Sequence, residues 1–169
     1  MKKLLILFLL IPFLVRAYST SATSAILMDL DSGRIIYANN KDLVRSVASI
    51  SKIMTAVVAI ESDKLDEIVT VGSEIKSAYG SGIYIKEGEE LTLRDLLYGL
   101  MLRSGNDAAL SIATYVGGDV QTFVSMMNDK AKSIGMKNST FNNPSGLDQE
   151  KGNYSSAYDM ALLMKYAYH

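Results

Sequence analysis

Hydrophobic residues early in the chain form two short runs around a polar turn. Residues 25–30 and 34–38 are largely apolar, and the DSG segment at 31–33 has the composition of a turn between strands. This pattern predicts a β-hairpin. In the later stretch where glycine and charged residues recur, strand-like pieces are expected only at 68–71 and 83–86.

The second half of the chain has the spacing of amphipathic helices. Thr92 and Asp95 form the pattern of a capping box at the head of an apolar stripe that stops near Arg103. The stripe consists of Leu93, Leu96, Leu97, Leu100 and Met101. A helix is therefore predicted from Thr92 to about Arg103.

Three further helices are expected after this one. The glycine pair at 117–118 ends the first, a second runs from 119 to about 134, and the last begins at Ser156. Asp107 is expected to cap the first of these helices and Asp159 the last.

Residues 45–60, RSVASISKIMTAVVAI, join a helical apolar run to a serine and a lysine three residues apart, Ser49 and Lys52. Positions i and i+3 of a helix lie on one face, so the amine can reach the hydroxyl. A serine becomes a good nucleophile only when a base accepts its proton. Because the single histidine is His169 and cysteine is absent, a lysine with a lowered pKa is the candidate base.

The serine–lysine pair is not specific when it is taken alone. An S-x-x-K motif occurs by chance roughly once in a chain of this length, and Ser73 with Lys76 repeats it inside a glycine-rich stretch that predicts a loop. For Ser49 and Lys52 alone, the competing interpretation is a helix N-cap serine followed by a solvated lysine.

A second polar element interrupts two apolar helices at 104–106, with the sequence SGN. Ser104 and Asn106 are explained either as a helix cap with a turn or as a hydroxyl and an amide presented to a cleft.

The N-terminus has the pattern of a secretory signal. Two lysines precede an apolar block at 4–15, which is shorter than the about 20 helical residues that span a bilayer. Cleavage is expected after Ala17 or Ala22, which would place the protein on the periplasmic or cell-wall side of the membrane. A buried N-terminal helix is the alternative. Residues 18–169 are predicted to form one domain.

Charge and cysteine content narrow the class of protein. The formal net charge is -1, and removal of Lys2, Lys3 and Arg16 with the signal changes it to -4, so no basic surface for nucleic acid is expected. Without cysteine the fold must depend on its hydrophobic core, and metal sites built from Cys or several His are excluded. No cofactor or metal is indicated.

Several segments together resemble the D-alanyl-D-alanine carboxypeptidases, the low-molecular-weight penicillin-binding proteins. Penicillin-binding proteins combine an S-x-x-K element with an S-x-N and a K-T-G element, and residues 49–52 and 104–106 match the first two. The resemblance runs in order through AILMDLDSGRIIYANN, SVASISKIMTA, LTLRDLLYGLMLRSGNDAAL, FVSMMNDKAKSIGMKNSTFNNPSGLD and YSSAYDMALLMKYA. It implies an α+β fold of the β-lactamase/transpeptidase-like serine type, with an N-terminal β-hairpin and a helical lobe but without the C-terminal sheet strands.

The resemblance also implies roles for four residues. Ser49 would be the acylated nucleophile, Lys52 its proton acceptor, Ser104 a hydroxyl that helps move the proton, and Asn106 the group that binds the substrate amide. The implied substrate is a peptidoglycan stem peptide ending in D-Ala-D-Ala, from which D-alanine is released through an acyl-enzyme. β-Lactams would acylate the same serine, and a backbone N–H of Ser49 would contribute to the oxyanion hole.

Two departures from the family pattern leave alternatives, and the first is Val47, which stands where the family commonly has proline. The SGN segment differs from the SDN of class A β-lactamases, so a β-lactamase is the less favoured enzyme class. No K-T-G or K-S-G occurs in these residues. The expectation is a truncated carboxypeptidase, with a non-catalytic secreted wall-binding remnant as the alternative. Association with a membrane surface is expected only through a C-terminal tail absent from these residues.

Overall fold

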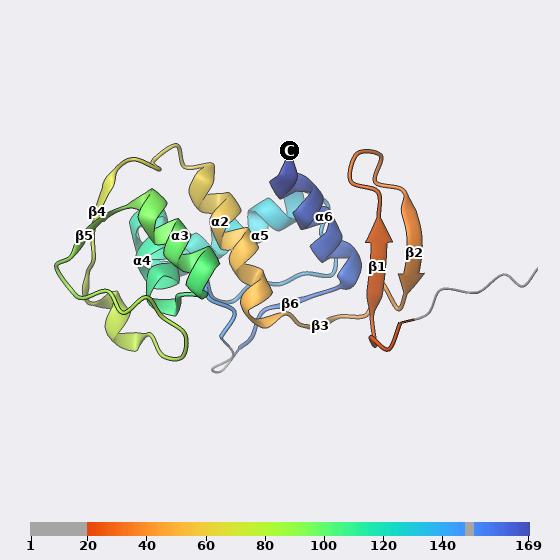
Figure 1. Ribbon diagram of the computed structural model, residues 1–169, viewed down its shortest axis with the longest axis horizontal. Coiled ribbons are helices and arrows are strands. Elements are labelled where there is room, and N and C mark those ends of the chain that lie inside the picture. Colours follow the sequence, from red (N-terminus) through yellow and green to blue (C-terminus); the bar gives the residue numbers. More distant parts are fainter. Residues whose placement is uncertain (1–19, 148–150) are drawn as a thin grey trace, which may run out of the picture.

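The computed structural model describes residues 20–147 and 151–169, which combine helices with short antiparallel strands (Figure 1). The predicted α+β class is therefore confirmed. The predicted signal at 1–17 lies outside the described residues, so export stays a prediction. In chain order the elements are β1 (Ala25–Met28), β2 (Ile35–Asn39), β3 (Arg45–Ser46), the 3-10 helix η1 (Ala48–Ser51), α2 (Lys52–Ile60), β4 (Ile68–Thr70), the 3-10 helix η2 (Ser73–Ser77), β5 (Glu90–Thr92), α3 (Leu93–Arg103), α4 (Asn106–Gly117), α5 (Val120–Ser133), β6 (Tyr154–Ser155) and α6 (Ala157–Tyr168).

The predicted hairpin is confirmed as the antiparallel pair β1–β2. Its turn is longer than the DSG segment, because the backbone bonds that close it join Asp29 to Gly33 and to Arg34. Gly33 has a φ of 72°, a conformation that costs glycine little. The hairpin lies beside α6 at one end of the molecule (Figure 1), and Lys165 of α6 donates to the carbonyl of Asp31 at 2.8 Å.

Two further pairs of strands connect distant parts of the chain. β4 pairs with β5, and β3, just before the Ser49 segment, pairs with β6. The strand expected at 68–71 is thus confirmed, but the one expected at 83–86 is wrong. Its backbone N–H groups bind the Asp107 carboxylate instead of a neighbouring strand, and Tyr84 has a φ of 61°.

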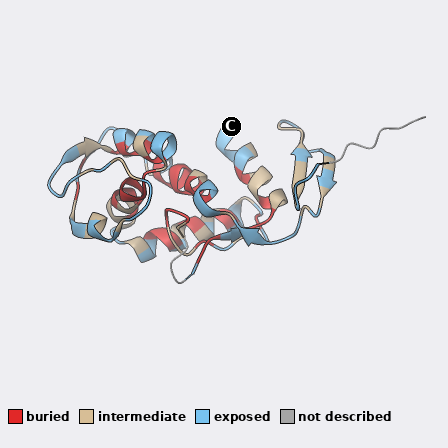
Figure 2. Ribbon diagram, turned by 60° about the horizontal axis from the view of Figure 1, so that its bottom comes forward, coloured by how far each residue is buried: buried red, intermediate tan, exposed pale blue. Residues whose placement is uncertain are grey.

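The core of the described chain lies between the helices, whereas the hairpin has no buried residue (Figure 2). α2 packs against α3, α4, α5 and α6, and its middle is buried on all sides. The fully buried large side chains include Met54, Leu93, Leu96, Leu100, Ile112, Phe123, Met127 and Leu163. The helix that follows Ser49 is therefore central to the core.

The helix caps confirm part of the sequence prediction. Thr92 and Asp95 form the predicted capping box of α3, and Ser156 caps α6. Gly105, not Asp107, is the N-cap of α4. The Asp107 carboxylate nevertheless accepts from the Ala108 N–H in the first turn at 2.8 Å, so its predicted capping role is confirmed in part. The capping role predicted for Asp159 is wrong, because its carboxylate accepts from the Asn138 backbone instead of the α6 terminus.

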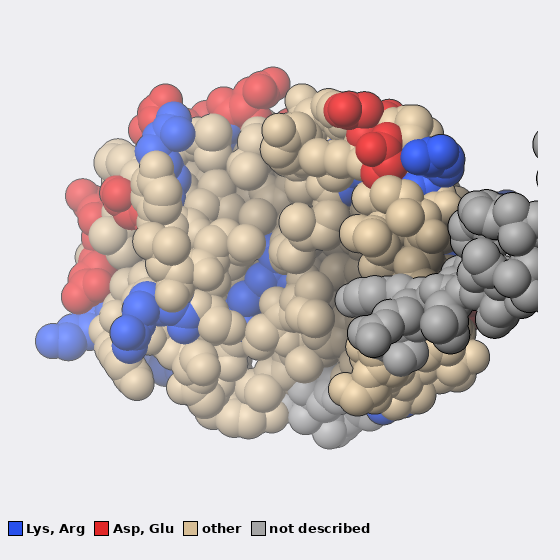
Figure 3. Space-filling view, turned by 45° about the vertical axis from the view of Figure 1, so that its right-hand side comes forward, with Lys and Arg blue, Asp and Glu red and all other residues tan. Residues whose placement is uncertain are grey.

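The surface of the described residues carries scattered charge. Figure 3 shows acidic side chains mainly along the upper and left edges of one face, with uncharged residues over most of the area between. Within residues 20–147 and 151–169, no helix is both long enough and apolar enough to cross a membrane.

Candidate active site

The structure brings Ser49 and Lys52 together where η1 passes into α2. Ser49 lies within η1 and is exposed, whereas Lys52 is the first residue of α2 and is only 3% exposed. The Lys52 Nζ lies 3.2 Å from the Ser49 Oγ. The alternative of an N-cap serine and a solvated lysine is wrong for this pair, because Ser51 holds the N-cap position and the lysine is buried.

The second S-x-x-K pair is built differently. Ser73 and Lys76 lie in η2 where a loop was predicted, and the Lys76 ammonium forms an exposed salt bridge with Glu87. The Lys76 and Glu87 side chains are both largely exposed to solvent, so this lysine takes part in an ordinary surface ion pair. Burial therefore distinguishes the two motifs.

Burial changes the proton affinity of Lys52. Removing the ammonium from water disfavours its charge, and this lowers the pKa of Lys52 from an ordinary 10.5 to about 8. At pH 7 about one molecule in ten then carries a neutral amine. A base of this strength can accept a hydroxyl proton near neutral pH.

The partners of Lys52 fit both of its protonation states. Besides Ser49, the Nζ contacts the Asn106 Oδ1 at 2.8 Å and the Ser145 carbonyl at 2.7 Å. Both of these oxygens can only accept, so they take the two N–H groups of a neutral amine and leave its lone pair for the Ser49 hydroxyl proton. An ammonium uses its third N–H toward Ser49. A proton can thus move between Ser49 and Lys52 without breaking any other bond.

Asn106 is oriented by a third residue. Its Nδ2 donates to the Tyr79 carbonyl at 2.6 Å, which leaves Oδ1 to face Lys52. Ser104, the other predicted residue of this element, ends α3 in a left-handed conformation and is half-buried. Among the described residues its hydroxyl makes no hydrogen bond to Ser49 or Lys52. The structure therefore joins Ser49, Lys52 and Asn106, and places Ser104 two residues before Asn106.

The Ser145 carbonyl is a site group that the sequence did not reveal. Residues 142–147 form a turn-rich loop, whose composition is visible in the sequence, but a backbone carbonyl carries no residue-type signal. The buried Asn153 side chain fixes the loop. Its Oδ1 accepts from the backbone N–H groups of Asn142 and Asn143, and its Nδ2 donates to the Asn143 carbonyl. The position of this loop therefore determines where the Ser145 carbonyl, a hydrogen-bond acceptor for Lys52, lies.

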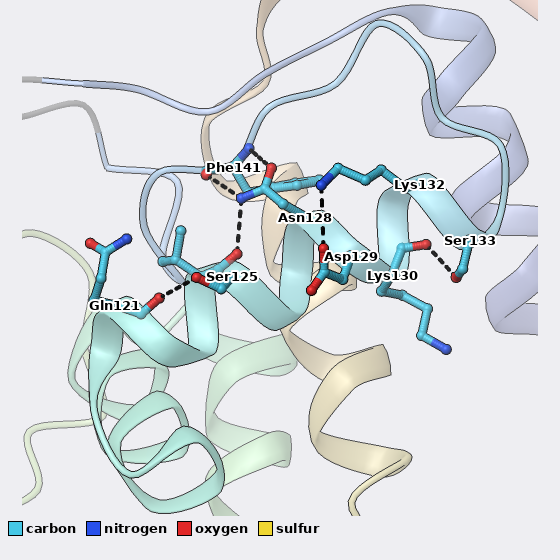
Figure 4. Close-up of polar contacts among 9 residues, drawn as sticks. Gln121, Ser125, Asn128, Asp129, Lys130, Lys132, Ser133 and Phe141 are labelled. Atoms are coloured by element: carbon cyan, nitrogen blue, oxygen red, sulfur yellow. Dashed lines mark hydrogen bonds and ion pairs between the residues drawn. The ribbon is translucent and has the colours of Figure 1, made fainter.

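The loop is also held on α5 (Figure 4). Asn128 accepts from the Phe141 N–H at 2.9 Å and donates to the Phe141 carbonyl at 2.7 Å. This double hydrogen bond fixes the chain directly before the loop. On α2, the buried Thr55 hydroxyl donates to the Pro144 carbonyl at 2.7 Å.

A pocket of about 500 Å³ adjoins this group of residues. Asn106 and Ser145, both partners of Lys52, form part of its wall, together with Tyr79, Leu110 and Asn143. Among the described residues, no three His, Cys, Asp or Glu side chains lie close enough together to hold a metal ion.

Comparison with known proteins gives relatives named D-alanyl-D-alanine carboxypeptidase and D-alanyl-D-alanine endopeptidase. The chain is 40% identical to the D-alanyl-D-alanine carboxypeptidase DacF of Bacillus subtilis over 149 residues, covering 85% of this chain and 38% of DacF. It is 39% identical to the carboxypeptidase DacC of Escherichia coli over 169 residues, covering 92% of this chain and 41% of DacC. The chain therefore spans about two fifths of the length of these two relatives.

Solved structures show the same relationship. Penicillin binding protein 6B of Escherichia coli matches with a TM-score of 0.85 at 38% identity, covering 94% of this chain and 53% of that one. The predicted transpeptidase-like fold is confirmed over this part. The sequence profile of the family described as D-alanyl-D-alanine carboxypeptidase matches residues 12–169. This chain belongs to the D-alanyl-D-alanine carboxypeptidase family.

Proposed function

We propose that this chain forms an acyl-enzyme at Ser49, as part of a serine-type carboxypeptidase that trims peptidoglycan stem peptides ending in D-Ala-D-Ala. The observation that carries this proposal is the set of bonds around Lys52. Two acceptors occupy two of its N–H groups, and the remaining position faces the Ser49 hydroxyl. Family membership and the name of the relatives support the choice of substrate.

In the first step, the Ser49 Oγ attacks the carbonyl carbon of the penultimate D-alanine while its proton passes to the neutral Lys52 amine. The developing oxyanion would accept from backbone N–H groups, including that of Ser49. The C–N bond then breaks, and the leaving amine takes a proton that originates at Lys52. Ser104 is proposed to relay this proton, and Asn106 to bind the substrate amide.

In the second step, water attacks the Ser49 ester. Lys52, neutral again, accepts the water proton and returns a proton to the Ser49 oxygen as the ester bond breaks. A β-lactam carries a strained amide that would react with Ser49 in the same first step. Acylation by a penicillin is therefore a direct measure of the proposed chemistry.

Labelling with a fluorescent penicillin tests this function. The wild-type chain is expected to take one label, which mass spectrometry of its peptides places on Ser49. Ser49→Ala should take none. Lys52→Met keeps the length of the side chain but removes the base, and labelling should slow by about 10²–10⁴-fold, the usual contribution of a general base.

The second S-x-x-K motif supplies matched controls. Ser73→Ala and Lys76→Met change the same residue types at the same spacing, but in an exposed 3-10 helix. Both variants should label at the wild-type rate. Wild-type protein that takes no label, or Ser49→Ala protein that labels normally, would contradict the proposed chemistry.

We also propose that the protein is exported. The support is the sequence of residues 1–17, with two lysines followed by an apolar block. N-terminal sequencing of the protein expressed in a bacterial host should give a chain that starts after Ala17 or Ala22. A chain that retains Met1 in the cytoplasm would contradict export.

A further inference from the structure

Asp107 is a buried carboxylate that the proposed chemistry does not use. It is 6% exposed and follows Asn106 directly in α4. Its oxygens accept from three consecutive backbone N–H groups of a distant loop: Ile83 at 3.1 Å, Tyr84 at 2.6 Å and Ile85 at 3.3 Å. Such a concentration of hydrogen bonds on one carboxylate fixes the position of the loop.

The same loop contacts Asn106 at two points. The Asn106 backbone N–H donates to the Ser81 carbonyl at 2.8 Å, and the Asn106 Nδ2 donates to the Tyr79 carbonyl at 2.6 Å. Residues 79–85 therefore lie across the start of α4, with one end on the Asn106 side chain and the other on the Asp107 carboxylate.

The backbone of this loop needs support to keep its path. Tyr84 has a φ of 61°, an uncommon conformation for a residue with a side chain. Tyr84 is also 77% exposed, so packing of its own side chain does not hold it there. The short bond from its N–H to Asp107 does so instead.

The orientation of the Asn106 amide matters for Lys52. As long as the Tyr79 carbonyl occupies the Nδ2 side, only the Oδ1 is available to the Lys52 Nζ. If the Asn106 amide turned over, its NH₂ group would face Lys52, and Lys52 would lose one of its hydrogen-bond acceptors. The lysine would then have no fixed arrangement of N–H groups, and its lone pair would no longer be directed at Ser49.

We propose that Asp107 is a positioning residue: through residues 79–85 it holds the Tyr79 carbonyl on Asn106, and so determines which atom of the Asn106 amide meets Lys52. A carboxylate suits this role because both of its oxygens accept, whereas an asparagine would place an NH₂ group against backbone N–H groups. The effect on acylation rests on the function proposed above. The effect on the Asn106 amide does not.

Nuclear magnetic resonance of the full chain tests the proposal without turnover. The side-chain NH₂ protons of Asn106 should exchange slowly in the wild type, because one is bonded to Tyr79 and both lie in a buried residue. In Asp107→Asn this exchange should become roughly tenfold faster, as expected for the loss of one net hydrogen bond, and the Lys52 Nζ resonance should move. Penicillin labelling, measured separately, should slow in the same variant.

Asp159→Asn is the matched control. Asp159 is equally buried, and its carboxylate also holds a loop by accepting from the Asn138 N–H at 2.6 Å and the Ser139 hydroxyl at 2.8 Å. Its replacement should lower stability but leave the Asn106 and Lys52 resonances unchanged. A merely structural role for Asp107 predicts the same behaviour for both variants, and that result would overturn the proposal.

Gly82→Ala provides a second variant in case Asp107→Asn does not fold. A Cβ at Gly82 would lie 3.1 Å from the Asp107 Oδ2, so the loop or the carboxylate must shift by a few tenths of an ångström while the charge is kept. The Tyr84 N–H resonance reports whether its bond to Asp107 is lost. Faster exchange of the Asn106 NH₂ protons when that bond is lost supports the proposal. Unchanged exchange in a folded variant that has lost the bond would overturn it. Loss of penicillin labelling in the wild type would contradict the proposed function and leave the exchange result standing.

Discussion

Gly146 lies so close to the carbonyl group of Ala48 that a Cβ atom at Gly146 would overlap it. Ala48 precedes the nucleophile candidate Ser49 and itself has a φ of 44°. The Ser51 hydroxyl donates to the same Ala48 carbonyl at 2.7 Å. The loop that supplies an acceptor to Lys52 therefore also limits the space around the turn that presents Ser49.

Gly146→Ala should destabilise the protein more than strain alone explains. Its φ of 76° costs a residue with a side chain about 1–2 kcal/mol, and overlap with the Ala48 backbone should add about 1–3 kcal/mol, the usual cost of overpacking. Urea unfolding measures the sum. Gly118→Ala is the control, because Gly118 has a similar φ of 80° but no neighbour within 4 Å. Equal losses in the two variants would show that the close approach has no energetic effect.

Stability should rise with pH in the range where Lys52 differs between the folded and unfolded chains. Its pKa is about 8 when folded and near 10.5 when unfolded, so between these values the unfolded chain binds more protons. Below pH 8 the folded state bears the full cost of a buried ammonium, and this cost disappears as pH rises to 10.5. The gain is on the order of 3 kcal/mol.

Comparison with Lys52→Met isolates this contribution from other groups that titrate at high pH. The free energy of unfolding of the wild type, minus that of the variant, should increase between pH 8 and 10.5 and stay flat from pH 6 to 7. Parallel curves over the whole range would mean that the pKa of Lys52 is not lowered in the folded state.

Asn153→Ala should lower the free energy of unfolding by about 3 kcal/mol. Asn153 is fully buried, and its removal leaves the N–H groups of Asn142 and Asn143 and the Asn143 carbonyl without their partner. Chemical denaturation provides the value. Gln121→Ala, which removes an exposed amide from α5, should change stability by less than about 0.5 kcal/mol. A small effect at Asn153 would indicate that water replaces its bonds.

Leu100→Ala should destabilise the protein by about 2–5 kcal/mol, because Leu100 is fully buried in the helical core and its truncation leaves a cavity. Leu102 lies on the same helix but is 77% exposed, so Leu102→Ala should change stability by less than about 0.5 kcal/mol. Thermal unfolding of both variants tests which face of α3 packs. Similar losses would mean that the two faces are equally covered.

The sequence predicted the local elements well, since hydrophobic spacing and caps act within a few residues. The hairpin, the capping box at Thr92 and the burial of Leu100 follow from this pattern, although Met101, expected in the same stripe, is 49% exposed. The strand at 83–86 was predicted wrongly. Its backbone bonds a carboxylate more than twenty residues away, and no local pattern contains that information.

In the candidate site, too, the sequence determined some features and the tertiary structure determined others. The sequence by itself determined the residue types and spacing of Ser49 and Lys52, the polar break at Asn106, and family membership through segments in a fixed order. Only the tertiary structure decided that Lys52 is buried while Lys76 is exposed. It also placed the Asn106 Oδ1 and the Ser145 carbonyl within hydrogen-bond distance of the Lys52 Nζ. Burial and backbone position depend on contacts across 54 and 93 residues of chain. They set the pKa of Lys52, and with it the chemistry open to Ser49.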